Sequence, residues 1–221
     1  MAYPVLPKVK ICCIASPDEA RMAIRAGASA LGLVAEMPSG PGVISDDMIR
    51  RIARSTPPPI ATFLLTSRTH AARIAAHQQA TGANTVQIVD ALSEGSYADL
   101  RAALPGIALV QVVHVIDEAS IEEALALAPQ VDALLLDSGN PNLAVKELGG
   151  TGRVHNWSLS RKIVEQAGVP VFLAGGLRPD NVRAAVDAVQ PWGLDLCSGV
   201  RTEGRLDERK LDAFFAALAA L

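Results

Sequence analysis

The fold is decided by a stretch in the second half of the chain, Val131-Asp132-Ala133-Leu134-Leu135-Leu136-Asp137. This is an almost unbroken apolar run that ends in a carboxylate. A strand that is apolar at consecutive positions is buried on both faces, as in a parallel sheet covered by helices. Runs rich in Val, Ile and Leu recur on both sides of it. The predicted strands span residues 8–14, 28–34, 59–65, 84–89, 107–114, 131–137, 170–174 and 193–197.

Alanine-rich amphipathic segments separate these strands, and several carry Ser, Thr or Asp at or just before the first turn. Eight strands, each followed by a helix, favour one closed (β/α)8 TIM barrel over an open sheet with two edges. The length of 221 residues fits one such barrel, so a single catalytic domain over residues 1–221 is predicted, with its site at the C-terminal ends of the strands. Helices are predicted to open near Asp18, Asp46, Thr69, Ser96, Glu118, Trp157, Pro179 and Asp207.

The composition excludes several classes of partner. Half of the residues are hydrophobic and only 19% are charged, which provides a large core and no sign of disorder. A formal net charge of −3 gives no general field to attract nucleic acid or an acidic membrane. No segment reaches the ~18 uninterrupted apolar residues of a membrane span, and the N-terminus lacks the apolar stretch of a signal peptide. We therefore predict a cytoplasmic protein whose partner is a small molecule.

The three cysteines, Cys12, Cys13 and Cys197, are predicted to be free thiols. Adjacent cysteines do not readily form an ordinary disulfide, and the spacing does not match a zinc pattern. Because strand side chains alternate between faces, Lys10 and Cys12 are expected to share one face while Cys13 takes the other, so that one cysteine enters the barrel mouth. The histidines are scattered without metal-ligand spacing, and no metal site is predicted.

Two stretches near the C-terminus are typical of phosphate binding. In Leu173-Ala174-Gly175-Gly176-Leu177, a strand ends in a glycine pair and a helix follows. Glycine lets the backbone approach an anion closely, and free N–H groups at the start of a helix donate to phosphate oxygens. The second stretch, Asp195-Leu196-Cys197-Ser198-Gly199-Val200, ends the eighth strand. Loops after strands 7 and 8 are the frequent phosphate position in this fold, although each glycine taken alone could equally serve a tight turn.

Cys12 lies near the end of the first predicted strand and Asp137 at the end of the sixth, where barrel enzymes present catalytic groups. A thiol and a carboxyl group suit proton transfer next to a developing carbonyl, provided that the thiol is ionised and the carboxyl is protonated. Taken alone, Cys12 is more often a small buried hydrophobe. Asp137 is a stronger candidate, because a carboxylate after four apolar residues is costly unless it is exposed or paired.

In order and in combination, these motifs resemble those of the phosphoribosylanthranilate isomerase family, over essentially the whole chain. Lys8-Val9-Lys10-Ile11-Cys12 is similar to the family's opening strand, and Leu135-Leu136-Asp137-Ser138 to its L-L-D-[ST] strand. Gly149-Gly150-Thr151-Gly152 resembles its G-G-[ST]-G loop, and the two stretches with Gly175-Gly176 and Ser198-Gly199 resemble its phosphate loops.

The resemblance implies an Amadori rearrangement without a cofactor, in which a phosphoribosyl amine opens its ring and becomes an aminoketose. Asp137 is then the general acid that protonates the ring oxygen, and Cys12 is the general base that removes the proton from sugar C2. Phosphate binding is assigned to Gly152, Gly175, Gly176, Ser198 and Gly199, and substrate binding to Lys10 and Asp195.

Three positions depart from the family pattern. Cys13 stands where the family usually has glycine, Gly42 where it usually has an arginine expected to bind the anthranilate carboxylate, and Val89 where it usually has histidine. A lost charge-assisted pair of this kind weakens binding by about 1.5–3 kcal/mol. Arg178, Arg68 and Arg153 are the candidates to replace that charge.

Three alternatives to the anthranilate reaction therefore stay open. The first is the same rearrangement on a different phosphoribosyl amine, which Gly42 and Val89 motivate. The second is a barrel that binds phosphosugars without turnover, for which Cys12 and Asp137 would be unnecessary. The third is an aldolase or decarboxylase, for which Lys10 is the only near Schiff-base candidate. The oligomeric state, monomer or homodimer, also stays open, because the apolar segment 214–221 could pair with another copy or pack on the barrel.

Overall fold

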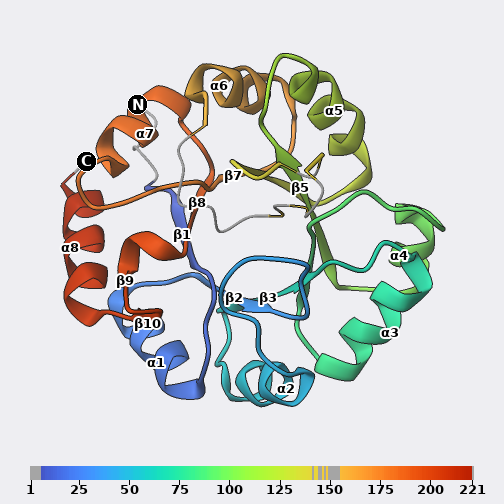
Figure 1. Cartoon of the computed structure of the whole chain (residues 1–221), viewed down its shortest axis with the longest axis horizontal. Coiled ribbons are helices and arrows are strands. Elements are labelled where there is room, and N and C mark those ends of the chain that lie inside the picture. The colour runs from blue at the N-terminus through green and yellow to red at the C-terminus, as the bar shows by residue number, and fades with distance from the viewer. Residues whose placement is uncertain (1–5, 141, 144–145, 147, 149–154, 221) are drawn as a thin grey trace.

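Eight parallel strands pair in chain order and close on themselves, because β1 pairs with β8 as well as with β2. The computed structural model describes residues 6–140, 142–143, 146, 148 and 155–220. Helices form a ring outside the strands (Figure 1). The predicted (β/α)8 barrel is confirmed. The strands are β1 (Lys8–Ile11), β2 (Ala30–Val34), β3 (Ala61–Thr66), β4 (Thr85–Ile88), β5 (Ala108–His114), β6 (Ala133–Asp137), β7 (Val171–Leu173) and β8 (Gly193–Leu196).

The α-helices begin where the sequence places capping residues. Ser16, Ser45 and Asp207 each accept a hydrogen bond from a first-turn backbone N–H, which satisfies a donor that the helix itself leaves unpaired. The helices are α1 (Pro17–Ala26), α2 (Asp46–Ser55), α3 (Ala71–Thr81), α4 (Tyr97–Ala103), α5 (Ala119–Leu127), α6 (Trp157–Gln166), α7 (Val182–Val189) and α8 (Glu208–Ala219).

Two predicted boundaries are wrong by three residues, and the others differ from the structure by at most two. The first strand ends at Ile11 rather than at residue 14, because Cys13 has a φ of 62°, which no strand accommodates. The seventh helix begins at Val182 rather than near Pro179, because the side chain of Asn181 first closes a turn by accepting from the Arg178 N–H. The structure also adds a short hairpin that the sequence reading missed, β9 (Arg201–Thr202) and β10 (Arg205–Leu206).

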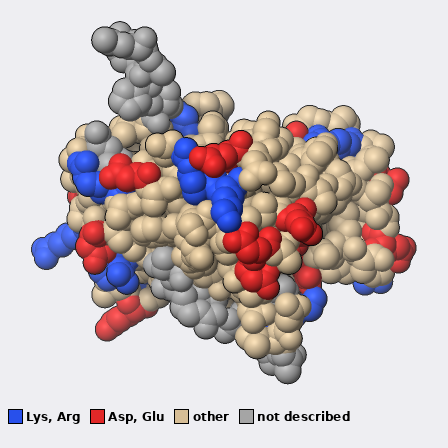
Figure 2. Space-filling view, turned by 90° about the horizontal axis from the view of Figure 1, so that it is seen from above, with Lys and Arg blue, Asp and Glu red and all other residues tan. Residues whose placement is uncertain are grey.

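The apolar side chains lie in two layers. One fills the inside of the barrel and includes Phe63, Leu135 and Phe172, while the other packs between strands and helices. Phe214 and Leu218 of α8 are buried in that outer layer, so this helix packs on the barrel. Positive and negative side chains are intermixed on the face seen in Figure 2, as the small net charge predicts. Within the described part of the chain, no helix is long and apolar enough to cross a membrane.

Candidate active site

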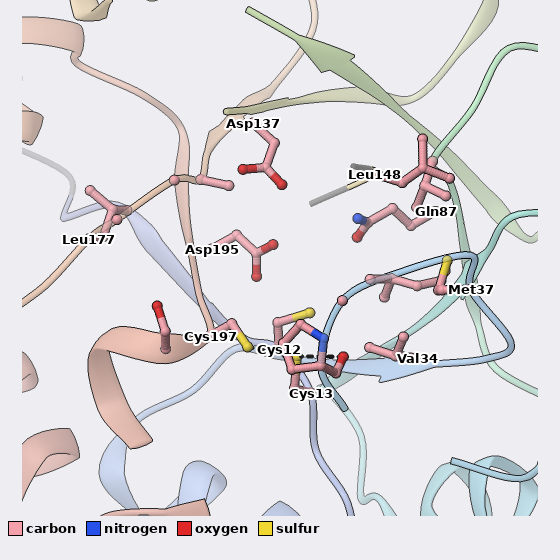
Figure 3. Close-up of a pocket in the computed structure, with 18 of the residues that line it drawn as sticks. Cys12, Cys13, Val34, Met37, Gln87, Asp137, Leu148, Leu177, Asp195 and Cys197 are labelled. Carbon is pink, nitrogen blue, oxygen red and sulfur yellow. Dashed lines mark hydrogen bonds between the residues drawn. The ribbon is translucent and has the colours of Figure 1, made fainter. Parts of the chain in front are cut away.

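A pocket of about 710 Å³, open to solvent, lies at the C-terminal ends of the strands. It is formed by residues that are far apart in the sequence, and Figure 3 shows their side chains gathered around one space. Closure of the barrel brings them together, because every parallel strand delivers its C-terminal residue to the same rim. The pocket contains most of the predicted site residues: Cys12, Asp137, Gly175, Gly176, Asp195, Ser198 and Gly199. Gly152 lies outside the described residues.

Cys12 directly follows β1 and is buried in the pocket wall. Its backbone N–H donates to the carbonyl of Leu196 at 2.7 Å, which fixes the chain against β8. Gly32 on the neighbouring strand makes room for the thiol, since a Cβ at that position would lie 2.7 Å from the Cys12 sulfur. The backbone of Cys12 is therefore fixed against β8, and the thiol occupies the space that Gly32 leaves on β2.

Asp137 ends β6 and lies on a different wall of the same pocket from Cys12 (Figure 3). One carboxylate oxygen accepts a hydrogen bond from the backbone N–H of Ser138 at 2.7 Å. The side chain is only 8% exposed. His155 lies close enough for the charge of Asp137 to act on it, but burial outweighs that charge and lowers the pKa of His155. A half-buried imidazole, whose neutral form is favoured by burial, therefore stands near this carboxyl group.

Lys10 and Asp195 form a buried ion pair at 2.8 Å between Nζ and Oδ1. Asp195 lines the pocket, whereas Lys10 lies beneath it and is fully buried. Burial acts to lower the pKa of Lys10, but the Asp195 carboxylate and the neighbouring thiols outweigh it and raise that pKa above its ordinary value. An amine that stays protonated is no nucleophile, so the Schiff-base alternative loses its candidate.

The two glycine-rich loops after β7 and β8 lie against each other on one side of the pocket. Gly175 and Gly176 have φ angles of 86° and 62°, which other residues adopt only with strain. The carbonyl of Gly176 accepts from the Asn181 side chain at 2.9 Å. A Cβ on Gly199 would lie 2.0 Å from the carbonyl oxygen of Leu177, so a side chain there would force the two loops apart. This is a cradle of backbone groups suited to an anion.

Cys13 also lines the pocket, so the prediction that only one cysteine enters the barrel mouth is wrong. The alternation rule holds for extended backbone, and Cys13 is left-handed with a φ of 62°. Its sulfur lies 2.7 Å from the sulfur of Cys197 and 3.6 Å from the carbonyl oxygen of Pro41. Three thiols therefore meet at one wall of the pocket (Figure 3).

A buried arginine from the β9 strand fixes the backbone around these cysteines. The Arg201 guanidinium donates to the carbonyls of Cys12 and Cys13, at 3.1 and 2.5 Å, and to the carboxylate of Glu19. Burial raises the pKa of Glu19, but hydrogen bonds from the Leu206 and Ala15 N–H groups and from Arg201 outweigh it and lower that pKa. The charged Glu19 in turn orients Arg201.

Comparison with known proteins agrees with this geometry. The family model described as N-(5'phosphoribosyl)anthranilate (PRA) isomerase matches residues 9–217. The chain belongs to this family. An N-(5'-phosphoribosyl)anthranilate isomerase of Methanosarcina mazei is 38% identical over 213 residues, which cover 94% of this chain and 92% of that protein.

Two solved isomerases of this family give the same picture in three dimensions. One, in complex with reduced 1-(o-carboxyphenylamino)-1-deoxyribulose 5-phosphate, superposes with a TM-score of 0.78 at 27% identity, over 97% of this chain and 100% of that one. The other, a monomeric variant of the dimeric isomerase from Thermotoga maritima, has a TM-score of 0.77 at 25% identity with the same coverage.

Two of the departures from the isomerase pattern, at positions 13 and 42, are in direct contact with each other. A Cβ on Gly42 would lie 2.5 Å from the Cβ and 2.8 Å from the sulfur of Cys13. The thiol at position 13 therefore excludes a side chain at position 42, and the two departures are one coupled change. Val89, also buried in the pocket lining, presents an apolar surface where the isomerase family usually has a histidine.

The three candidate arginines are not equivalent. Arg68 contacts the ring of His77, Arg178 pairs with Asp180 beside the phosphate loops, and Arg153 lies outside the described residues. Neither Arg68 nor Arg178 is among the described residues that line the pocket.

Sequence reasoning missed Gln87 as a site residue. It is 3% exposed, lines the pocket, and its Oε1 has no hydrogen-bond partner among the described residues. A polar residue within the apolar β4, two positions before Val89 and therefore on the same face, was the signal that could have found it.

Proposed function

We propose that this protein isomerises N-(5'-phosphoribosyl)anthranilate to 1-(2-carboxyphenylamino)-1-deoxyribulose 5-phosphate, a step of tryptophan biosynthesis, with Cys12 and Asp137 as base and acid. The observation that carries the proposal is the joint placement of this thiol and this carboxyl group in one pocket that also contains the paired glycine loops. A phosphate in the loops anchors one end of the sugar phosphate, and the two proton-transfer groups then act on the other end.

The reaction proceeds by two proton transfers. Asp137 in its protonated form gives its proton to the furanose ring oxygen, the C1–O bond breaks, and the ring opens to a Schiff base between C1 and the amine. The Cys12 thiolate then removes the proton from C2, and the electrons move to the nitrogen to give an enolamine. Tautomerisation of the enolamine gives the ketone. General acid and base each contribute about 100- to 10,000-fold to such steps.

The remaining pocket residues position the substrate. Gly175, Gly176, Ser198 and Gly199 hold the phosphate through backbone N–H groups, and Gly152 is proposed to complete that site. The second carboxylate oxygen of Asp195, whose Oδ1 accepts from Lys10 at 2.8 Å, and the Oε1 of Gln87, which has no hydrogen-bond partner among the described residues, accept hydrogen bonds from sugar hydroxyl groups. Two such buried acceptors suit a polyhydroxyl substrate.

The test is the loss of fluorescence of N-(5'-phosphoribosyl)anthranilate, generated in situ, with wild type, Cys12→Ala and Asp137→Asn side by side. We expect rapid loss with the wild type and a reduction of about 100-fold or more in each variant. Circular dichroism checks that all three proteins are folded. Turnover of another phosphoribosyl amine, with none of the anthranilate adduct, would select the alternative substrate. Phosphosugar binding without any turnover would select the non-catalytic barrel.

The proposal also covers the cellular location and the oligomeric state of the enzyme. Cys12, Cys13 and Cys197 are free thiols, which persist in a reducing compartment, and this supports a cytoplasmic location. Residues 1–221 are proposed to form one catalytic domain that works as a monomer or a homodimer. The Thermotoga maritima relative is described as dimeric, and sedimentation velocity distinguishes the two states for this chain.

A further inference from the structure

The two sulfur atoms of Cys13 and Cys197 are much closer than nonbonded neighbours. They lie 2.7 Å apart, whereas carbon atoms in contact are about 3.5–4.0 Å apart and sulfur atoms are larger. A disulfide requires about 2.05 Å, so a relative movement of roughly 0.7 Å would complete the bond. Both side chains line the active-site pocket (Figure 3).

The backbone explains why these two thiols meet. Ile11 on β1 is paired with Leu196 on β8, so the residues that follow each strand leave the barrel side by side. The left-handed conformation at Cys13 then turns its side chain toward β8 instead of the opposite face. Gly42 leaves the space that the Cys13 side chain occupies.

The local charges give the two thiols different roles. The hydrogen bond with Cys13 lowers the pKa of Cys197 against the effect of burial, and the nearby Arg201 charge lowers it further. Hydrogen bonds with Cys12 and Cys197, together with burial, raise the pKa of Cys13. Cys197 is therefore the more readily ionised thiol of the pair and its nucleophile, and it is also the more exposed of the two.

We propose that Cys13 and Cys197 are a reversible oxidation site, at which hydrogen peroxide forms an intramolecular disulfide that switches the enzyme off. The Cys197 sulfur attacks peroxide, the O–O bond breaks, hydroxide leaves, and a sulfenic acid forms. The Cys13 sulfur then attacks the Cys197 sulfur, the S–O bond breaks, and the oxygen leaves as water. In total, two thiols are oxidised to one disulfide while one peroxide is reduced to two waters.

The disulfide would displace the two halves of the active site. Cys13 directly follows Cys12, the proposed base, and Cys197 directly precedes Ser198 of the phosphate loop. The bond needs a movement of roughly 0.7 Å shared by the two sulfur atoms. A misplacement of about 1 Å at a reacting group costs on the order of 100-fold in rate, so a loss of about tenfold is expected for this smaller movement. This effect on catalysis rests on the proposed function, whereas formation of the disulfide does not.

The first part of the experiment detects the bond without any activity measurement. Reduced protein is treated with graded hydrogen peroxide, and non-reducing peptide mapping then looks for a cross-link to the peptide that carries Cys197. Trypsin leaves Cys12 and Cys13 on one peptide, since it cuts after Lys10 and Arg21, so variants identify the partner. We expect the cross-link in wild type and in Cys12→Ser, and none in Cys13→Gly. A cross-link that survives in Cys13→Gly, or none in wild type, would overturn the proposal.

The second part measures isomerisation before oxidation, after oxidation, and after dithiothreitol. Wild type is expected to lose activity by about tenfold and to regain it with the reductant. Cys197→Ser is compared with its own reduced state, and its loss should be much smaller at the same peroxide dose. Full activity in cross-linked wild type, or a loss that dithiothreitol does not reverse, contradicts the switch. If reduced wild type lacks activity, the proposed function fails while the peptide map still decides whether the pair forms.

Discussion

The close contact between Cys13 and Gly42 allows a quantitative test by a double-mutant cycle. Gly42 has a φ of 82°, and a Cβ there would lie 2.5 Å from the Cys13 Cβ. In Gly42→Ala, the left-handed conformation costs about 1–2 kcal/mol and the overlap with Cys13 about 1–3 kcal/mol, so a loss of about 2–5 kcal/mol in the free energy of unfolding is expected. In a Cys13→Gly background the overlap with the Cβ and sulfur is gone. The conformational cost of about 1–2 kcal/mol remains, together with a tight contact of 3.0 Å to the Cα of residue 13. The coupling energy is therefore about 1–3 kcal/mol.

Urea unfolding of wild type, the two single variants and the double variant measures this coupling. Gly82→Ala is the matched control, because Gly82 has a φ of 73° but no atom within 4 Å of its added Cβ. It should show the conformational cost alone and add to Cys13→Gly without coupling. If Gly42→Ala and Cys13→Gly were additive within about 0.5 kcal/mol, the steric reasoning would be refuted.

Gly42→Arg with Cys13→Gly is further expected to lower the KM for the anthranilate substrate about tenfold or more, by supplying a charge-assisted contact.

Three further outcomes are expected. Folding lowers the pKa of Glu19, so its carboxylate stabilises the protein above its ordinary pKa of about 4.3. This stabilisation is lost as the pH falls through the lower pKa of the folded state. Urea unfolding of Glu19→Gln at a series of acidic pH values should therefore show a weaker dependence of stability on pH than wild type. Lys10→Met removes the ion-pair partner of the buried Asp195 and should lower the free energy of unfolding by about 3–5 kcal/mol. The double variant Lys10→Met with Asp195→Leu should restore most of this stability. Equal losses of stability in thermal unfolding of the two proteins would contradict this. Gly199→Ala should raise KM more than it lowers kcat. Its Cβ would lie 2.0 Å from the carbonyl oxygen of Leu177, which would distort the phosphate loop. Steady-state kinetics in which only kcat falls would argue against a binding role for this loop.

The barrel and the position of its site could be predicted from the sequence because the pattern of apolar residues indicates which segments are buried. The run that became β6 is apolar throughout, and its terminal Asp137 had to reach a rim or a partner. The glycine loops could likewise be predicted, because two backbone segments that lie as close as those at Gly199 require a residue without a Cβ.

Other features of the site could not be predicted from the residue pattern. Cysteine is rarely left-handed, so the conformation of Cys13 and its contact with Cys197 could not be expected from alternation. Arg201 holds the carbonyls of Cys12 and Cys13, residues 189 and 188 positions away, and nothing in its own neighbourhood in the sequence marks it. Contacts of this kind depend on which strands become neighbours when the barrel closes.

The pairing of β1 with β8 has a consequence for the synthesis of the chain. A ribosome releases Lys10 and Cys12 early, yet their neighbours on β8 emerge only after all seven other strands, and Asp195 is 185 residues from Lys10. Until then one edge of β1 lacks its strand partner and Lys10 lacks its counter-ion, and an unpaired strand edge is a site of aggregation. The contact that closes the ring is thus among the last to form, and it assembles the base, its backbone support and the phosphate loop at the same moment.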